Sequence, residues 1–246
     1  MIGALFSPFH EISRGLSVYV KGFRWLQKHP SYFILLLLPM AISLLLLAAT
    51  WGLFTKYHDS VLALIMFDKP GTFLLIALYY LAKATLYIVL FVMSLIFYML
   101  VLNVISAPIY DLVSAAVEKD LTGRADDETS LWEAFLLMKE ELKKVLFIFL
   151  VSVLLLLIPG VNIISPLITA FFVGWEFYDF SLARKKWPFK KRLGFVFKHI
   201  WSVTGFGLWL LIPGGQMILM PLAVVGGTML AVEDLNRTEN ANKGNL

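Results

Sequence analysis

The chain has 246 residues, of which 59% are hydrophobic and only 15% are charged, and its formal net charge is +4. A soluble domain carries about 25% charged residues, so this composition excludes an ordinary soluble protein and predicts an all-α integral membrane protein with a single membrane domain. The sequence contains no cysteine, which excludes disulfides, thiolate catalysis and cysteine-based metal sites.

The first predicted element is an amphipathic helix over residues 7–29. Apolar residues recur there at helical spacing, while charged residues such as Glu11, Arg14 and Lys21 occupy the other positions. Such a helix is expected to lie along the membrane interface. The segment lacks the long apolar core that is typical of a cleaved signal peptide.

Two long apolar segments follow, over residues 32–54 and 72–107. The first has about 23 residues, enough to cross a bilayer. The second has about 36 residues and would be about 54 Å long, so it must tilt strongly or project beyond a hydrocarbon core of about 30 Å. Residues 108–144 are the most polar stretch, and we expect them to form cytoplasmic helices.

A proline-glycine break interrupts an apolar run twice, at Pro159-Gly160 and at Pro213-Gly214. Proline removes a helical donor and glycine tolerates a sharp reversal, so each break ends a helix. The apolar stretches before the breaks have about 14 and 12 residues, too few to cross upright. We therefore predict partly penetrating, re-entrant hairpins over 145–180 and 200–235. The alternative is two ordinary helical pairs with extended ends.

The distribution of positive charge predicts the orientation. Of the 21 lysines and arginines, only Lys56 and Lys69 fall in the loop between the two long spans, and Lys83 lies within the second span. The others lie in segments that the predicted topology places on one side, and the positive-inside rule makes that side the cytoplasm. We expect a multi-pass protein of the bacterial inner (plasma) membrane with both termini in the cytoplasm.

Motifs of common enzyme classes are missing from the sequence. It contains no HExxH, GxxxxGK[ST] or GxSxG, and its four histidines lack metal-ligand spacing. We therefore expect neither an enzyme nor a bound metal or other cofactor.

The strongest polar candidate is the corner that joins the interfacial helix to the first span. A helix start combined with cationic and amide side chains makes an anion site. The predicted anion-binding residues are Arg24, Gln27, Lys28, His29 and Ser31. Alternatively, the cations at this corner only bind lipid phosphates.

A second candidate is the pair of proline-glycine turns. Helices that begin at Gly160 and Gly214 would point their amide ends into the membrane domain, as broken helices of transporters do. Asn162 and Gln216 occupy matching places there and could donate hydrogen bonds to a pore or gate. Alternatively, they cap helices. Asn103, within the second span, is either a pore residue or a helix-contact residue.

Acidic residues end both hairpins. They are Glu176 and Asp179 in the first, and Glu233 and Asp234 in the second. We expect structural ion pairs with the basic residues of 184–192, with Lys139, Lys143 and Lys144, or with Lys83 if its side chain points inward. A proton relay is the alternative.

A basic-aromatic strip lies between the hairpins, over residues 184–192. Such a strip is typical of contact with anionic lipid headgroups. We do not expect nucleic acid to bind there.

Several segments together resemble the CysZ family of bacterial sulfate permeases, which is related more distantly to the etoposide-induced 2.4 membrane proteins. The resemblance covers about residues 15–235, and its matching pieces are residues 27–30 with Pro39, 107–109 through 121–123, 158–160 with Pro166, 187–190, and 220–224. It implies an inner-membrane homo-oligomer that admits sulfate for assimilation into cysteine. One departure is that Tyr32, Phe33 and Ile34 stand where family members carry arginines.

The resulting hypothesis is a sulfate permease, acting as a channel or as a proton-coupled transporter, with sulfite as a competitor or regulator. The alternative is a non-transporting membrane scaffold or an anion-sensing protein. A transporter requires wet hairpin turns, whereas a scaffold does not.

Overall fold

The protein is described here by a computed structural model. The residues whose structure it describes are 2–65, 71–123, 131–158, 160, 163–212 and 215–243. Within these ranges the regular secondary structure is entirely helical. The chain divides into two compact units, one formed by Met1–Ile34 with Tyr110–Leu246 and the other by Leu35–Ile109.

The smaller unit is formed by most of α2 (Pro30–Ile65) and the first part of α3 (Phe73–Thr122). Polar contacts join the two helices at two levels: the hydroxyls of Ser43 and Tyr98 lie 2.5 Å apart, and the Tyr87 hydroxyl donates to Asp59 at 3.1 Å. Between these levels the Trp51 ring meets the edge of a phenylalanine of α3. The unit is therefore an extended helical pair with a sparse set of specific contacts.

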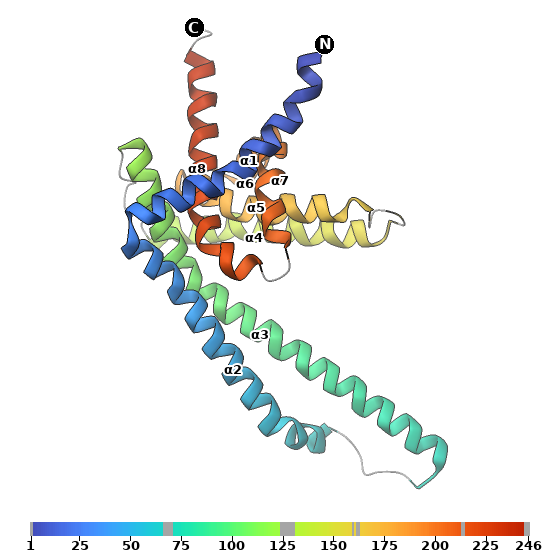
Figure 1. Cartoon of the computed structure of the whole chain (residues 1–246). Coiled ribbons are helices and arrows are strands. Elements are labelled where there is room, and N and C mark those ends of the chain that lie inside the picture. Colours follow the sequence, from blue (N-terminus) through green and yellow to red (C-terminus); the bar gives the residue numbers. More distant parts are fainter. Residues whose placement is uncertain are drawn as a thin grey trace. The chain divides into compact units, whose positions relative to one another are not determined.

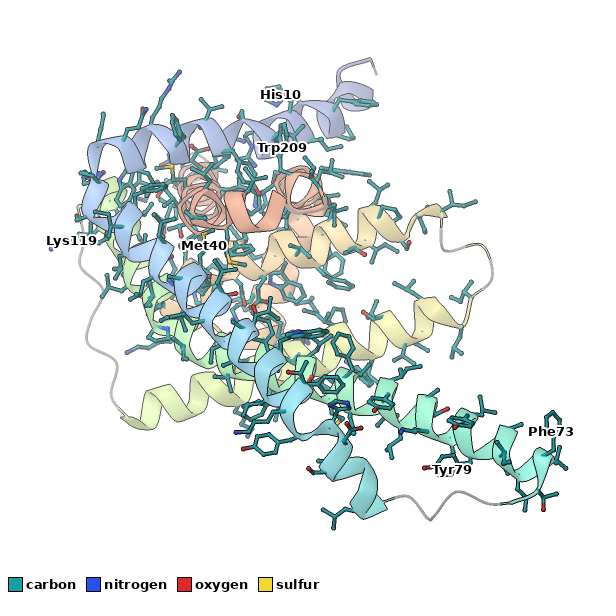
Figure 2. The ribbon with its side chains drawn as sticks, turned by 60° about the horizontal axis from the view of Figure 1, so that its bottom comes forward. His10, Met40, Phe73, Tyr79, Lys119 and Trp209 are labelled. Atoms are coloured by element: carbon teal, nitrogen blue, oxygen red, sulfur yellow. The ribbon has the colours of Figure 1, made fainter. Side chains whose placement is uncertain are left out.

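Apolar side chains of this pair are mostly exposed. Figure 2 shows Phe73 on the first turn of α3 projecting away from the helix, and 86% of its surface is accessible. Pro30–Val61 and Phe73–Tyr98 are both long and apolar enough to cross a membrane. An apolar surface of this extent is expected where lipid, rather than water, is the solvent.

The larger unit has its core where four helices cross: α1 (Ile2–Lys28), α5 (Ser165–Arg184), α7 (Ile200–Leu208) and α8 (Gly215–Lys243). Helices α1 and α5 both pack against α7 and α8 (Figure 1). The largest fully buried apolar side chains include Trp175, Tyr178 and Phe206. Tyr19 of α1 stacks on Phe206 with its ring 4.9 Å away and donates its hydroxyl to the Phe206 carbonyl.

Glycines allow these helices to touch through their backbones. A Cβ atom added to Gly15 would lie 2.1 Å from the Ser202 carbonyl oxygen, and one added to Gly207 would lie 1.8 Å from that of Ala170. No larger residue fits at either place. Small residues at helix crossings are the usual means of close approach in membrane proteins, which explains why so short a helix as α7 carries two glycines.

The remaining helices of the larger unit are α4 (Leu131–Leu156) and α6 (Phe189–Lys198), with the short 3-10 helix η2 (Trp209–Leu211) after α7. The Phe147 ring of α4 lies 6.1 Å from that of Trp175 in α5. Glu140 of α4 accepts a hydrogen bond from the Phe189 amide at 2.6 Å and so caps α6.

The second hairpin contains a third helix long and apolar enough to cross a membrane. It is Leu219–Ala241 in α8, and 72% of its most apolar window is buried inside the protein. Length and composition therefore qualify this helix for spanning, whereas its burial shows that most of its surface faces other helices. The interfacial position of α1 and the re-entrant depth of the hairpins remain predictions.

Candidate functional site

The predicted anion corner lies where α1 ends and α2 begins. Arg24, Gln27 and Lys28 are spaced three and four residues apart, which places them on one face of the last turn of α1. All three side chains are exposed. No carboxylate of the described residues lies within 4.0 Å of Arg24 or Lys28. The corner therefore presents two uncompensated cations and one amide on the same face.

Aromatic contacts hold this corner in shape. The His29 ring stacks on the Trp25 ring at 4.3 Å, and its Nδ1 atom lies 3.1 Å from the Trp25 carbonyl oxygen. The Trp25 indole N–H donates to Asp120 at 2.9 Å. The Tyr32 amide donates to the His29 carbonyl at 3.1 Å, so this amide is not available to an anion. Ser31 is exposed.

Asp120 was not among the predicted site residues. It belongs to the end of α3, far along the chain from Trp25, and no sequence spacing connects the two. It brings an acidic group to the corner, but its carboxylate is engaged by the indole N–H.

The acidic residue at the end of the first hairpin lies in a buried ion cluster. The Asp179 carboxylate is 2.6 Å from the Arg192 guanidinium and 3.0 Å from the Lys144 ammonium. Glu141 pairs with both of these cations, at 2.6 and 2.8 Å. Glu176 is more exposed and lies 3.3 Å from Lys144. Ion pairs therefore connect the three helices α4, α5 and α6.

The charges of this cluster stabilise one another. Burial alone would raise the pKa of Glu141, but Lys144 and Arg192 outweigh it and hold that pKa below its usual value. Burial alone would lower the pKa of Lys144, but Asp179, Glu176 and Glu141 raise it above its usual value. Both groups are therefore charged at neutral pH.

The second hairpin ends in a similar cluster. The Asp234 side chain is fully buried and lies 2.6 Å from Arg14 of α1 and 3.4 Å from Nδ1 of His199. The Tyr178 hydroxyl donates to Asp234 at 3.0 Å. Because Tyr178 directly precedes Asp179, adjacent residues of α5 reach both clusters. Burial lowers the pKa of His199 despite its acidic neighbour.

Glu233 points to the surface side of the same cluster. It pairs with Lys21 at 2.5 Å and lies 3.8 Å from Arg14. Lys83, which was predicted as a partner for these acids, belongs to the smaller unit. Its ammonium lies 5.9 Å from the centroid of the Tyr87 ring.

The predicted pore residues are only partly described. Gly160 has a φ of +86°, in the left-handed region that favours glycine, and it is exposed. Asn162 and Gly214 lie outside the described residues. Asn103 and Gln216 belong to α3 and α8, but their side chains lie outside the described part of the structure.

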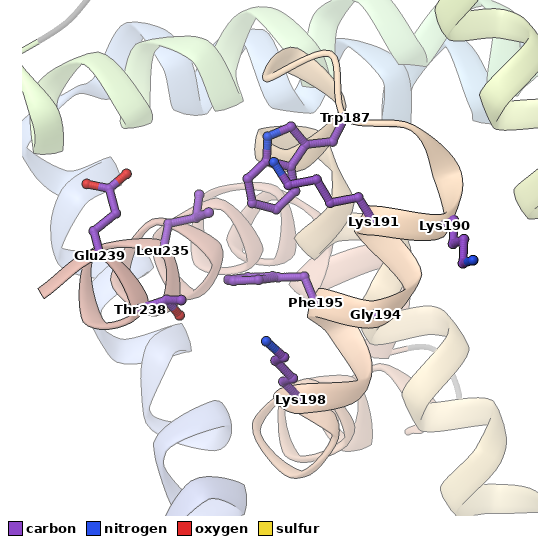
Figure 3. Close-up of a pocket in the computed structure, with 9 residues that line it drawn as sticks. All are labelled: Trp187, Lys190, Lys191, Gly194, Phe195, Lys198, Leu235, Thr238 and Glu239. Carbon is purple, nitrogen blue, oxygen red and sulfur yellow. The ribbon is translucent and has the colours of Figure 1, made fainter. Parts of the chain in front are cut away.

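A basic pocket lies between α6 and the last turns of α8 (Figure 3). Its volume is about 410 Å³, and the residues that line it are Trp187, Lys190, Lys191, Gly194, Phe195, Lys198, Leu235, Thr238 and Glu239. The predicted basic-aromatic strip supplies Trp187, Lys190 and Lys191. The rest comes from later in α6 and from α8, which only the tertiary structure brings near.

No group of three histidine or acidic side chains among the described residues could hold a metal ion.

Comparison with known proteins places the chain in a family. Residues 18–224 match the family described as sulfate transporter CysZ/etoposide-induced protein 2.4. The sulfate transporter CysZ of Pseudomonas aeruginosa strain PAO1 is 27% identical over 221 residues, which cover 83% of this chain and 89% of that protein. The sulfate transporter CysZ of Pectobacterium atrosepticum is 26% identical over 236 residues, which cover 89% of this chain and 84% of that protein. This chain, an all-helical membrane protein, therefore belongs to the sulfate transporter CysZ/etoposide-induced protein 2.4 family.

Proposed function

We propose that this protein is a sulfate permease of the bacterial inner membrane that admits sulfate for assimilation into cysteine. Membership of the family supports the proposal, together with relatives that are named sulfate transporters and match over most of their length. Three helices long and apolar enough to span a membrane agree with it.

The observation that carries the site is the uncompensated charge of Arg24 and Lys28. Many other basic side chains of the larger unit pair with carboxylates, as Arg14 does with Asp234 and Arg192 with Asp179. Cations that are already paired offer little to a further anion, whereas exposed and unpaired cations attract one. Arg24 and Lys28, with the Gln27 amide between them, form the proposed sulfate site together with His29 and Ser31.

The path beyond this corner is proposed to pass the hairpin turns. Sulfate is strongly hydrated, so a selective path must replace its water with fixed donors. Amides at helix starts and the side chains of Asn162, Gln216 and Asn103 would do this without a charge that traps the anion. Leucine at position 162 or 216 should therefore reduce sulfate flux.

The energetics of entry require a driving force. Moving two negative charges inward against a potential of 100 mV costs about 4.6 kcal/mol. A concentration gradient, consumption by downstream assimilation or coupling to protons must offset this cost. The first two suffice for a channel, and the third defines a proton-coupled transporter.

We assign a structural role to the acidic residues that end the hairpins. Asp179 and Asp234 are both buried, and each contacts two basic side chains, so each links neighbouring helices. A relay carboxylate must instead exchange its proton during each cycle.

The proposed partners include a second copy of this chain, anionic lipids, and sulfite as a competitor. One face of α4 supports the first: Leu146, Phe149 and Leu150 are more than half exposed. Such a face needs lipid or a neighbouring subunit as cover. Cross-linking in native membranes would distinguish the two, because only a neighbouring subunit gives a cross-linked dimer through this face.

Uptake of radiolabelled sulfate into proteoliposomes tests the function. We expect saturable uptake that sulfite inhibits and that phosphate inhibits less. Dependence on an imposed pH gradient would identify proton coupling, and independence from it a channel. Uptake equal to that of empty vesicles, by folded protein that still binds sulfate, would replace the permease with an anion sensor or scaffold.

A further inference from the structure

The pocket between α6 and α8 has the features of a binding site that is separate from the proposed sulfate corner. It has two walls from different helices, α6 and α8, and the Trp187 ring at one end (Figure 3). Phe195 and Leu235 line it and are each only 7% exposed, so the pocket has an apolar floor. Its volume of about 410 Å³ lies in the range of small-molecule sites.

The three lysines of this pocket form no ion pair with the described residues. No carboxylate of the described residues lies within 4.0 Å of Lys190, Lys191 or Lys198. The Lys191 ammonium lies 3.7 Å from the centroid of the Trp187 ring, a cation-π contact that holds it in place. In the view of Figure 3, Lys191 and Lys198 are drawn on either side of the Phe195 ring, while Lys190 extends away from it.

A bare inorganic anion is a poor match for this lining. Phe195 and Leu235 would strip water from such an ion and return no hydrogen bonds. The carboxylate of Glu239, on the α8 wall, would repel it. The same carboxylate and the Thr238 hydroxyl accept hydrogen bonds, so they suit a ligand that carries a hydroxyl or ammonium group beside its anionic group.

We propose that this pocket binds a phosphate ester. Its phosphate would contact Lys191, with Lys198 attracting it from the other side of the Phe195 ring. Its apolar part would cover Phe195 and Trp187, and its hydroxyl or ammonium group would face Glu239. Two sources supply this chemistry: the headgroup of an anionic phospholipid, whose glycerol offers hydroxyls, and a soluble nucleotide, whose base can stack on an indole. The proposal does not depend on sulfate transport.

Gly194 provides a sharp steric test. It lines the pocket, and a Cβ atom added to it meets no other atom within 4 Å. A larger side chain there therefore begins in open space at the lining of the pocket. Because Gly194 lies inside α6, the substitution also raises helix propensity. Gly194→Leu should therefore block the pocket in a protein that is at least as stable as the wild type.

The experiment is isothermal titration calorimetry of the full chain in a nonionic detergent. The probes are dihexanoyl phosphatidylglycerol, dihexanoyl phosphatidylcholine, AMP and inorganic sulfate. We expect phosphatidylglycerol, AMP or both to bind, and phosphatidylcholine to bind more weakly because its quaternary ammonium donates no hydrogen bond. Binding of phosphatidylglycerol alone identifies the membrane as the source, and binding of AMP alone identifies a soluble ligand.

Variants with matched controls decide whether the pocket is the site. Lys191→Gln with Lys198→Gln should weaken binding by about tenfold or more, since two charge-assisted contacts are lost. Lys119→Gln with Lys139→Gln removes the same charge from exposed positions elsewhere and should leave binding unchanged. Gly194→Leu should abolish binding, while Gly52→Leu, which also meets no neighbour, should not.

Three results would overturn the proposal. One is that neither phosphate ester binds the wild type. Another is that the control pair of lysine substitutions weakens binding as much as the pocket pair, which would indicate unspecific charge attraction. The third is that inorganic sulfate displaces the bound ester at the pocket, which would make this a sulfate site instead.

Discussion

The carboxylate of Asp179 lies 2.6 Å from the guanidinium of Arg192, and only 2% and 0% of the two side chains are exposed. The two side chains are buried because α4, α5 and α6 pack together around them. Lys144 contacts the same carboxylate at 3.0 Å. Asp179 thus lies between two buried cations, which Glu141 also contacts, and it is the most deeply buried acid of the cluster.

Replacement of Asp179 by asparagine tests its contribution to stability. It leaves the charges of Lys144 and Arg192 buried with too little compensation, so we expect a loss of about 3–5 kcal/mol in the free energy of unfolding. Glu176→Gln is the control, because Glu176 is 55% exposed and its one ion pair among the described residues is with Lys144; it should cost less than about 1 kcal/mol. Denaturant titration in detergent measures both. Equal losses would show that the exposure of the acid is irrelevant.

Close contact between helices gives a second prediction. Gly207→Ala places a Cβ atom 1.8 Å from the Ala170 carbonyl oxygen, so α5 and α7 must separate. We expect a loss of about 3 kcal/mol, at the upper end of the cost of overpacking. Gly194→Ala, in the open part of α6, should instead gain about 0.5–1 kcal/mol because alanine favours the helix. Comparison of the two melting temperatures in detergent checks the difference. A stable Gly207→Ala protein would contradict the packing of α5 on α7.

Much of the fold can be predicted from the composition and from the lengths of the apolar runs. They predict an all-helical membrane protein, and the two longest apolar runs lie in α2 and α3. The ends of these helices could not be placed. Helix α2 continues to Ile65 rather than ending near residue 54, because no proline or glycine follows Gly52 until Pro70 and the polar side chains near residue 58 contact α3. Helix α3 similarly continues through Pro108.

The basic partners of the buried acids were harder to predict from the sequence than the helices. Sequence reasoning suggested cations near residues 139–144 and the basic strip, and the structure places Lys144 and Arg192 beside Asp179. No local sequence pattern predicts the contact of Arg14 with Asp234, because the two residues are more than 200 positions apart in the chain. The same limit applies to the pocket, whose α8 wall meets α6 only through tertiary packing.

Two adjacent glutamates in the first half of α4 predict how stability depends on pH. Lys143 and the Phe189 amide hold the pKa of Glu140 below its usual value, and Lys144 and Arg192 overcome burial to lower that of Glu141. The unfolded chain therefore binds protons more readily than the folded one. The stabilisation is full above the ordinary glutamate pKa of about 4.3 and is lost as the pH falls through the lower native values.

Neutralising both glutamates should remove part of this dependence. Glu140→Gln with Glu141→Gln should be less stable than the wild type at pH 7, yet lose less stability as the pH falls from about 5 to about 3. Glu239→Gln, at an exposed position without an ion pair among the described residues, is the control and should follow the wild-type curve. Unfolding midpoints across this pH range measure the effect. Parallel curves for the wild type and the double variant would contradict it.

The proposed sulfate corner gives the last prediction. Arg24→Gln with Lys28→Gln keeps hydrogen-bonding groups but removes both uncompensated cations from the last turn of α1. Hydrogen bonds to charged groups contribute about 1.5–3 kcal/mol each, so we expect sulfate uptake at low sulfate concentration to fall by at least roughly tenfold. Lys119→Gln with Lys139→Gln has the same change in net charge and should retain uptake. Because the Trp25, His29 and Tyr32 rings hold the corner without these cations, the variant should fold normally. A folded variant with undiminished uptake would move the anion site away from this corner.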